Sequence, residues 1–166
     1  RTRQAVKCGS RKIARRWTGY LRELVAPHGD HHEAEEIEGA GVDGVILSKE
    51  SVDIYNPKTI RSTMGSVYRL PFLYVDSIES ILPVLKKHHV HTYAAHLKGK
   101  NSYEQEDYCG GTAFFIGNEG NGLTDHLSSQ ADTLIRIPME GKLESLNAAV
   151  ASAILMYESY RQRRNA

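Results

Sequence analysis

The chain has 166 residues, which suits one compact domain and leaves little room for a second. It is 40% hydrophobic and 25% charged with a formal net charge of only +1, so overall charge does not indicate a nucleic-acid binder, and no apolar run is long enough to span a membrane. No apolar run follows the basic N-terminus, which argues against a secretory signal, and the isolated Cys8 and Cys109 are expected to be reduced thiols of a cytoplasmic protein.

The first 38 residues have an uneven charge distribution. Eight basic and no acidic residues lie between Arg1 and Arg22, whereas Asp30 to Glu38 holds five acidic residues and no lysine or arginine. A basic segment can bind phosphates electrostatically, but a solvated or disordered tail is the more common meaning of such a stretch. We therefore predict that residues 1–38 form a basic then acidic segment that packs poorly, and that residues 39–166 form the folded domain.

Histidines and carboxylates gather in the acidic stretch. His28, His31 and His32 lie beside Glu33 and Glu35, and both residue types are zinc ligands. No recognised ligand spacing is present, and clustered polar residues are usually exposed. We therefore predict no metal site.

Strands and helices are predicted to alternate after Gly39. A short apolar run at 45–47 predicts a buried strand, and an asparagine-proline pair predicts a helix over 57–67. Apolar residues at helical spacing predict an amphipathic helix over 77–88, kinked at Pro83. A strand is predicted next, at 90–95.

The second half continues this alternation. Residues 98–111 are polar and predict a loop. Strands at 112–116 and 133–137 flank a short helix at 123–130, and Ser145 is expected to cap a long final helix. Apolar strands that alternate with helices indicate an α/β fold with a mostly parallel sheet and helices on both faces, and ligands of such sheets bind at the carboxyl ends of the strands.

Two loops at this edge carry distinctive motifs. Residues 116–123 read Ile-Gly-Asn-Glu-Gly-Asn-Gly-Leu, and three glycines allow close approach to a ligand, although this motif taken alone favours a tight strand-to-helix turn. Residues 137–141 read Ile-Pro-Met-Glu-Gly, and residues 143–151 read Leu-Glu-Ser-Leu-Asn-Ala-Ala-Val-Ala. Backbone amides at a helix start could hold a polar group there, or the segment could be a cap with small residues for close packing.

Together and in this order, the two motifs resemble the last two signature motifs of the SpoU family of RNA 2′-O-ribose methyltransferases, in the SPOUT superfamily. Residues 61–71, Arg-Ser-Thr-Met-Gly-Ser-Val-Tyr-Arg-Leu-Pro, also resemble a family segment. The resemblance runs from about Gly39 to Arg164. It implies an α/β domain with a C-terminal trefoil knot, which general topology rules would not predict.

The resemblance further implies a homodimer that uses S-adenosylmethionine and no metal to methylate RNA, either rRNA or tRNA. In the reaction, a ribose 2′-hydroxyl attacks the methyl group of the cofactor. Six positions match the cofactor site of the family: Gly117, Gly120, Gly122, Ile137, Met139 and Leu146. Three match its polar active-site positions: Glu119, Ser145 and Asn147.

The first motif of the family, Asp-Pro-x-Asn-x-Gly followed by an arginine that contacts RNA phosphate, is not matched. Counting back from Gly41 without gaps places Glu35 at the arginine and Gly29 at the asparagine, and only Pro27 agrees. A carboxylate repels phosphate where arginine would bind it in a bidentate manner. The strand expected before this motif is also missing from the sequence pattern.

Three explanations of this departure remain open. Residues before Gly39 come from a disrupted reading frame, the domain is divergent and inactive, or another basic residue such as Arg61 or Arg69 substitutes for the arginine. The leading hypothesis is an S-adenosylmethionine-dependent RNA 2′-O-ribose methyltransferase whose activity the lost motif leaves open. The alternative is a non-catalytic dimeric domain that binds S-adenosylmethionine or RNA. The sequence does not identify the RNA.

Overall fold

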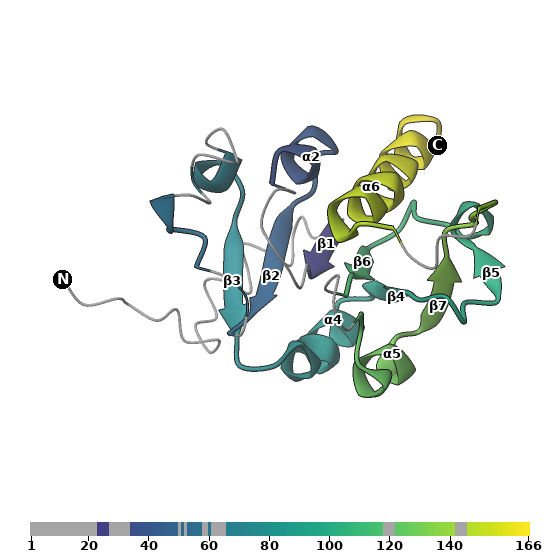
Figure 1. Cartoon of the computed structure of the whole chain (residues 1–166), viewed down its shortest axis with the longest axis horizontal. Coiled ribbons are helices and arrows are strands. Elements are labelled where there is room, and N and C mark those ends of the chain that lie inside the picture. Colours follow the sequence, from purple (N-terminus) through teal and green to yellow (C-terminus); the bar gives the residue numbers. More distant parts are fainter. Residues whose placement is uncertain are drawn as a thin grey trace.

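The structure, a computed structural model, describes residues 23–26, 34–49, 51, 53–57, 60, 66–117, 122–141 and 146–166. Its strands form one seven-stranded sheet in the order β3-β2-β1-β6-β4-β7-β5, and every neighbouring pair is parallel (Figure 1). In chain order the strands are β1 (Glu23–Ala26), β2 (Gly44–Ser48), β3 (Phe72–Val75), β4 (His91–Ala95), β5 (Asn101–Ser102), β6 (Thr112–Phe115) and β7 (Thr133–Arg136).

Helices cover both faces of the sheet. Helices α2 (Ala34–Gly39) and α6 (Ala148–Arg164) lie on one face, and α4 (Leu82–Lys87) and α5 (Asp125–Gln130) lie on the other (Figure 1). Three short 3-10 turns complete the described elements: η1 (Ser66–Tyr68), η2 (Ile78–Ile81) and η3 (Tyr103–Gln105). The predicted α/β class, with a parallel sheet and helices on both faces, is confirmed.

Two hydrophobic clusters, one on each face, explain why the strands are apolar throughout. In β6 and its continuation, Phe114 and Ile116 belong to the cluster under α2 and α6, whereas Ala113 and Phe115 belong to the cluster under α4 and α5. All four side chains are buried. Because successive residues of a strand point to opposite faces, a sheet covered on both sides selects apolar residues at every position.

The strands predicted at 45–47, 90–95, 112–116 and 133–137 correspond to β2, β4, β6 and β7. The helix predicted over 57–67 lies mostly outside the described residues. At its start the Ile60 N–H donates to the Asn56 carbonyl at 2.9 Å, which is the hydrogen-bond spacing of an α-helical turn.

Three local predictions were wrong. The helix predicted over 77–88 is divided into η2 and α4, with Pro83 in the first turn of α4, where its missing N–H costs no hydrogen bond. The loop predicted over 98–111 contains β5 and η3. Asn147 rather than Ser145 caps the final helix, because its side-chain oxygen accepts hydrogen bonds from the Ala149 and Val150 N–H groups at 2.9 and 3.2 Å.

The expectation that the strand before the first motif is missing was also wrong. Strand β1 lies inside the sheet, where Leu24 is paired with Gly44 of β2 and with Ala113 of β6. Helix α2 buries Ile37, which is 2% exposed, in the core. Part of residues 1–38 therefore belongs to the folded domain, and the predicted poor packing does not hold for these two elements. Residues 1–22 and the clustered histidines lie outside the described residues.

Side chains near the end of α6 fasten this helix to the segment before β6. The Gln162 amide donates to the Glu106 carbonyl at 2.9 Å and accepts from the Tyr108 N–H at 2.8 Å. The Arg163 guanidinium donates to the carbonyls of Tyr108 and Gly110 at 2.9 and 3.0 Å. Among the described residues, no helix is long and apolar enough to cross a membrane, and no cluster of histidine, cysteine and carboxylate side chains could hold a metal ion.

Candidate functional site at the carboxyl edge of the sheet

Three connections meet at one edge of the sheet because they follow three adjacent parallel strands. They are the turn after β4 (residues 96–100), the loop after β6 (116–122) and the loop after β7 (137–147). Strands β6, β4 and β7 are neighbours, so their carboxyl ends lie side by side. This edge is the usual ligand site of parallel α/β sheets, and it contains both sequence motifs.

The loop after β6 is closed at its base by two glycines. A Cβ atom added to Gly117 would lie 2.2 Å from the carbonyl carbon of Gly122 and 2.3 Å from the Leu123 nitrogen. Gly122 has a φ of +65°, a conformation that side chains disfavour. The two ends of the loop therefore touch through their backbones. Residues 118–121, which include the candidate residues Glu119 and Gly120, lie outside the described residues.

The turn after β4 crosses the end of β7. Strands β4 and β5 follow each other along the chain, but both pair with β7, which lies between them. The crossing is close, since a Cβ atom on Gly99 would lie 2.5 Å from the Ile135 carbonyl carbon. The His96 N–H donates to the Ile135 carbonyl at 2.9 Å, and His96 Nδ1 accepts from the Lys98 N–H at 3.0 Å.

The loop after β7 presents the apolar candidates. Ile137, Met139 and Leu146 are each half-buried, and Ile137 also packs against the core cluster under α6. They keep apolar surface exposed at the same edge as the glycine loop. Asn147 directly follows Leu146 and has its side-chain oxygen engaged by the α6 cap. Ser145 lies outside the described residues.

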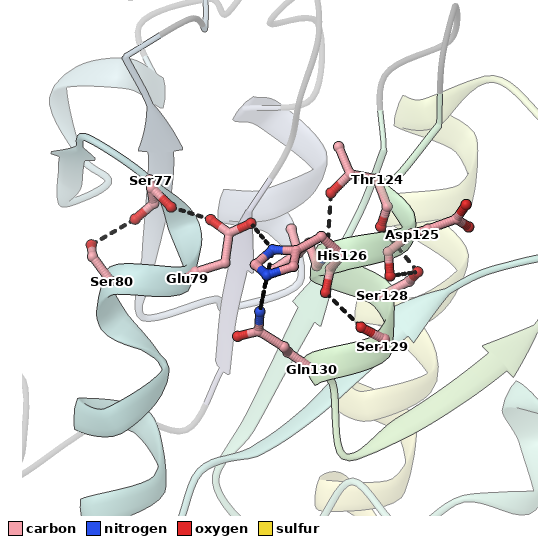
Figure 2. A network of polar contacts seen from close by, with 10 residues as sticks. Ser77, Glu79, Ser80, Thr124, Asp125, His126, Ser128, Ser129 and Gln130 are labelled. Carbon is pink, nitrogen blue, oxygen red and sulfur yellow. Dashed lines mark hydrogen bonds and ion pairs between the residues drawn. The ribbon is translucent and has the colours of Figure 1, made fainter.

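A polar network fastens the helix that follows the glycine loop. Figure 2 shows His126 of α5 between Glu79 of η2 and Gln130. His126 Nδ1 lies 3.3 Å from a Glu79 carboxylate oxygen, and the Ser77 hydroxyl donates to the other oxygen. The Ser77 hydrogen bond, with His126 contributing less, lowers the pKa of Glu79. The start of α5 is thereby attached to the neighbouring connection at this edge.

The structure speaks against Arg69 as a replacement for the lost arginine. Its guanidinium donates two hydrogen bonds to the Glu38 carboxylate, which also accepts the Ser66 hydroxyl at 2.6 Å. The hydrogen bonds from Arg69 and Ser66 lower the pKa of Glu38 to about 2. Arg69 also precedes β3 and so lies near the amino ends of the strands, at the edge opposite the candidate site. Arg61 and the side chain of Glu35 are outside the described residues.

His96 and Gly99 were missed by the sequence analysis. Both lie at the candidate site because β7 is inserted between β4 and β5. The sequence near His96 and Gly99 does not predict that a strand from much later in the chain takes this position. The only available signal was a glycine between two lysines directly after a strand. These three residues were included in the loop predicted over 98–111.

Comparisons with known proteins agree with this geometry. The profile of the SpoU rRNA Methylase family matches residues 36–157. The chain is 35% identical over 120 residues to the 23S rRNA (guanosine(2553)-2′-O)-methyltransferase RlmP of Bacillus subtilis, covering 72% of this chain and 48% of that protein. The chain spans about half the length of the curated relatives it matches.

Solved structures show the same fold. The SpoU methyltransferase AviRb from Streptomyces viridochromogenes aligns with a TM-score of 0.79 and 26% identity, over 86% of this chain and 60% of that chain. An rRNA methyltransferase from Sinorhizobium meliloti, crystallised with AdoMet bound, aligns with a TM-score of 0.76 and 31% identity, over 84% of this chain and 55% of that chain.

Proposed function

Because the chain belongs to the SpoU rRNA methylase family, we propose that it forms the cofactor-binding domain of an S-adenosylmethionine-dependent RNA 2′-O-ribose methyltransferase. The observation that carries the proposal is that the backbone contact of Gly117 with Gly122 after β6 and the half-buried apolar residues after β7 lie at the same carboxyl edge of the sheet. Two relatives with this fold are methyltransferases crystallised with AdoMet, which supports the same cofactor here.

The described residues fit such a cofactor. Ile137, Met139 and Leu146 offer apolar surface for a flat adenine ring, since none of the three is fully packed in the core. The contact of Gly117 with Gly122 leaves no side chain at the base of the loop to block an approach to its backbone. The role of Gly120 in the same loop follows from the family resemblance alone.

In this reaction the main task of the protein is to position the cofactor and the ribose. Bound S-adenosylmethionine would supply a methyl group already activated by the sulfonium. A ribose 2′-oxygen would form its bond to this methyl group as the carbon–sulfur bond breaks, S-adenosylhomocysteine would leave, and the hydroxyl proton would pass to a base. Of the three polar positions, Glu119 and Ser145 are proposed to serve the hydroxyl and its proton. Asn147 is a positioning residue in this scheme, because its cap fixes the start of α6 next to Leu146.

A trefoil knot and a homodimer remain part of the proposal. The crossing of the 96–100 turn over β7 supports a knot. Strands β4 and β5 follow each other along the chain, yet β7, which comes later, is inserted between them beneath the turn that connects them. An exposed row on α6 supports the dimer: Val150, Tyr157 and Tyr160 are each more than two-fifths exposed. A cytoplasmic location likewise remains an expectation, drawn from the isolated cysteines.

Calorimetric titration with S-adenosylmethionine tests the cofactor assignment. We expect saturable one-to-one binding by the unmodified chain and at least tenfold weaker binding, about 1.4 kcal/mol, by the Met139→Ala variant. The control is Val84→Ala, which removes an exposed side chain from α4, away from the site, and should bind as the unmodified chain does.

Mass spectrometry of RNA after incubation with the chain and S-adenosylmethionine then tests catalysis. New 2′-O-methylnucleosides in unmodified rRNA or tRNA transcripts would support the enzyme. Binding without methylation would favour the alternative, a non-catalytic dimeric domain. Absence of cofactor binding would overturn the proposal itself.

A further inference from the structure

Three cations gather where the turn after β4 crosses β7. Lys98 and Lys100 flank Gly99, whose position is fixed against the backbone at Ile135 and Arg136. Consecutive Cα atoms are about 3.8 Å apart, so the backbones of Lys98, Lys100 and Arg136 lie within about 10 Å of one another. The three residues come from a sheet crossing rather than from a single run of sequence. We call them the crossing patch.

The crossing patch is exposed and is not neutralised by the described residues around it. Lys98, Lys100 and Arg136 are all exposed, and none forms an ion pair within the described ranges. The Glu106 carboxylate, on the segment after β5, accepts a hydrogen bond from the Asn101 amide at 2.7 Å. Glu140 is an exposed carboxylate on the loop after β7, and the three cations outnumber it and Glu106, so the charge of these described residues is positive. Three other cations form ion pairs: Arg69 with Glu38, Lys49 with Asp76 and Arg161 with Glu158.

The backbone beneath the crossing patch is held in one arrangement. Strand β5 pairs with β7 through Asn101 with Ile135 and Ser102 with Arg136. His96 closes the turn from the other side through the Ile135 carbonyl and the Lys98 N–H. A ligand that binds these cations therefore does not have to order the main chain first, which reduces the entropic cost of binding.

We propose that the crossing patch binds the phosphate backbone of the RNA substrate next to the proposed methyl-transfer site. Arg136 directly precedes Ile137 of the proposed cofactor loop, so the patch adjoins the position where a ribose must be presented. Lysine and arginine side chains are the usual phosphate ligands of nucleic-acid-binding proteins. The patch thus supplies positive charge at the edge where the family's first-motif arginine has been lost. This inference rests on the proposed function.

Fluorescence anisotropy with a fluorescein-labelled RNA hairpin that has a single-stranded loop tests the patch. Binding is measured from about 50 to about 200 mM KCl for the unmodified chain and for a triple variant with Lys98→Gln, Lys100→Gln and Arg136→Gln. We expect the triple variant to bind roughly tenfold more weakly or worse at the lowest salt. Its log–log salt slope should fall by about 0.7 for each lost contact, or about 2 in total.

The matched control neutralises two cations at the opposite edge. Lys86 and Lys87 end helix α4 near the amino end of β4, are exposed and form no ion pair among the described residues. The variant Lys86→Gln/Lys87→Gln should keep the affinity and salt slope of the unmodified chain. An equal loss for each neutralised charge in both variants would mean that RNA binding follows net charge alone and would overturn the proposal.

Cofactor titration separates this inference from the proposed function. The triple variant should bind S-adenosylmethionine as the unmodified chain does. An unchanged RNA affinity and slope in the triple variant would overturn the crossing patch while leaving the cofactor assignment intact. If the unmodified chain binds cofactor but no RNA, the patch is also overturned, whereas failure to bind cofactor refutes the proposed function independently.

Discussion

At Gly117 a single added methyl group would collide with the backbone of the same loop. Its Cβ atom would approach Gly122 and Leu123 to within 2.2 and 2.3 Å, and backbone atoms cannot move aside as the end of a flexible side chain can. Gly110 offers the opposite case, because nothing lies within 4 Å of a Cβ atom placed there. The two glycines look alike in the sequence and differ only in what surrounds them.

The variant Gly117→Ala should therefore lower both stability and cofactor binding. We expect the free energy of unfolding to fall by about 1–3 kcal/mol, as for overpacked sites, and S-adenosylmethionine binding to weaken because the loop must open at its base. Urea denaturation and calorimetry measure the two effects. Gly110→Ala is the control and should change neither; equal behaviour of both variants would contradict the close contact.

Some residues of the candidate site could be identified from the sequence and others could not. Gly117, Gly122, Ile137, Met139 and Leu146 were named from motifs, and each described one lies at the carboxyl edge. That they have the assigned roles stays a prediction. Lys98 and Arg136 could not be paired in advance, because their proximity depends on which strand is inserted between two others.

Between elements, one ion pair joins α2 to η1. Glu38 of α2 binds Arg69 and Ser66, and these hydrogen bonds lower the carboxyl pKa from 4.5 to about 2. A carboxyl whose pKa is lower in the folded state contributes stability above its unfolded pKa, and this contribution disappears as the pH falls through the folded value. The pair therefore stabilises the fold above about pH 4.5 and loses its effect as the pH approaches 2.

Thermal melts of the Glu38→Gln variant between neutral and acidic pH test this contribution. The variant should melt below the unmodified chain near neutral pH, and the two melting temperatures should converge as the pH falls from about 4.5 to about 2. Arg69→Gln removes the same pair from the other side and should show the same convergence. A gap that stays constant with pH would mean that packing, not charge, joins the two elements.

Element positions were more predictable than element ends. Apolar runs located β2, β4, β6 and β7 because buried strands exclude polar residues from both faces. The cap of α6 was predicted at Ser145 and lies at Asn147, because both are good N-cap residues and the sequence does not show at which of them the helix begins. The division between η2 and α4 was also not predicted, because a proline fits the first turn of a helix as well as a kink within one.

For the molecule as a whole, β1 is the strand that joins two groups of strands. Strands β3 and β2 lie on one side of it and β6, β4, β7 and β5 lie on the other (Figure 1). The sequence analysis did not find β1, because the altered segment around it carries charges that suggest an exposed tail. Pairing on both sides of β1 is a property of the assembled sheet, not of these four residues.

Proline in β1 should therefore destabilise the entire fold. The backbone at Val25 is paired with Val45 on one side and with Phe114 on the other. Val25→Pro removes an N–H from an interior strand and should cost at least about 3 kcal/mol, enough to broaden or abolish cooperative unfolding. Val25→Ala keeps the N–H and serves as the control. Circular dichroism melts showing similar stability for both variants would contradict the bridging role.

The central place of β1 sets a problem for the chain during its synthesis. Among the described strands, β1 is made before the others and can pair with β2 soon afterwards, but its other partner, β6, is made only after β2, β3, β4 and β5. Until then one side of β1 presents unpaired backbone groups next to apolar faces, which is the kind of edge that recruits other strands. Nascent copies on neighbouring ribosomes would meet through this open edge, and chaperones that shield it should raise the yield of folded protein.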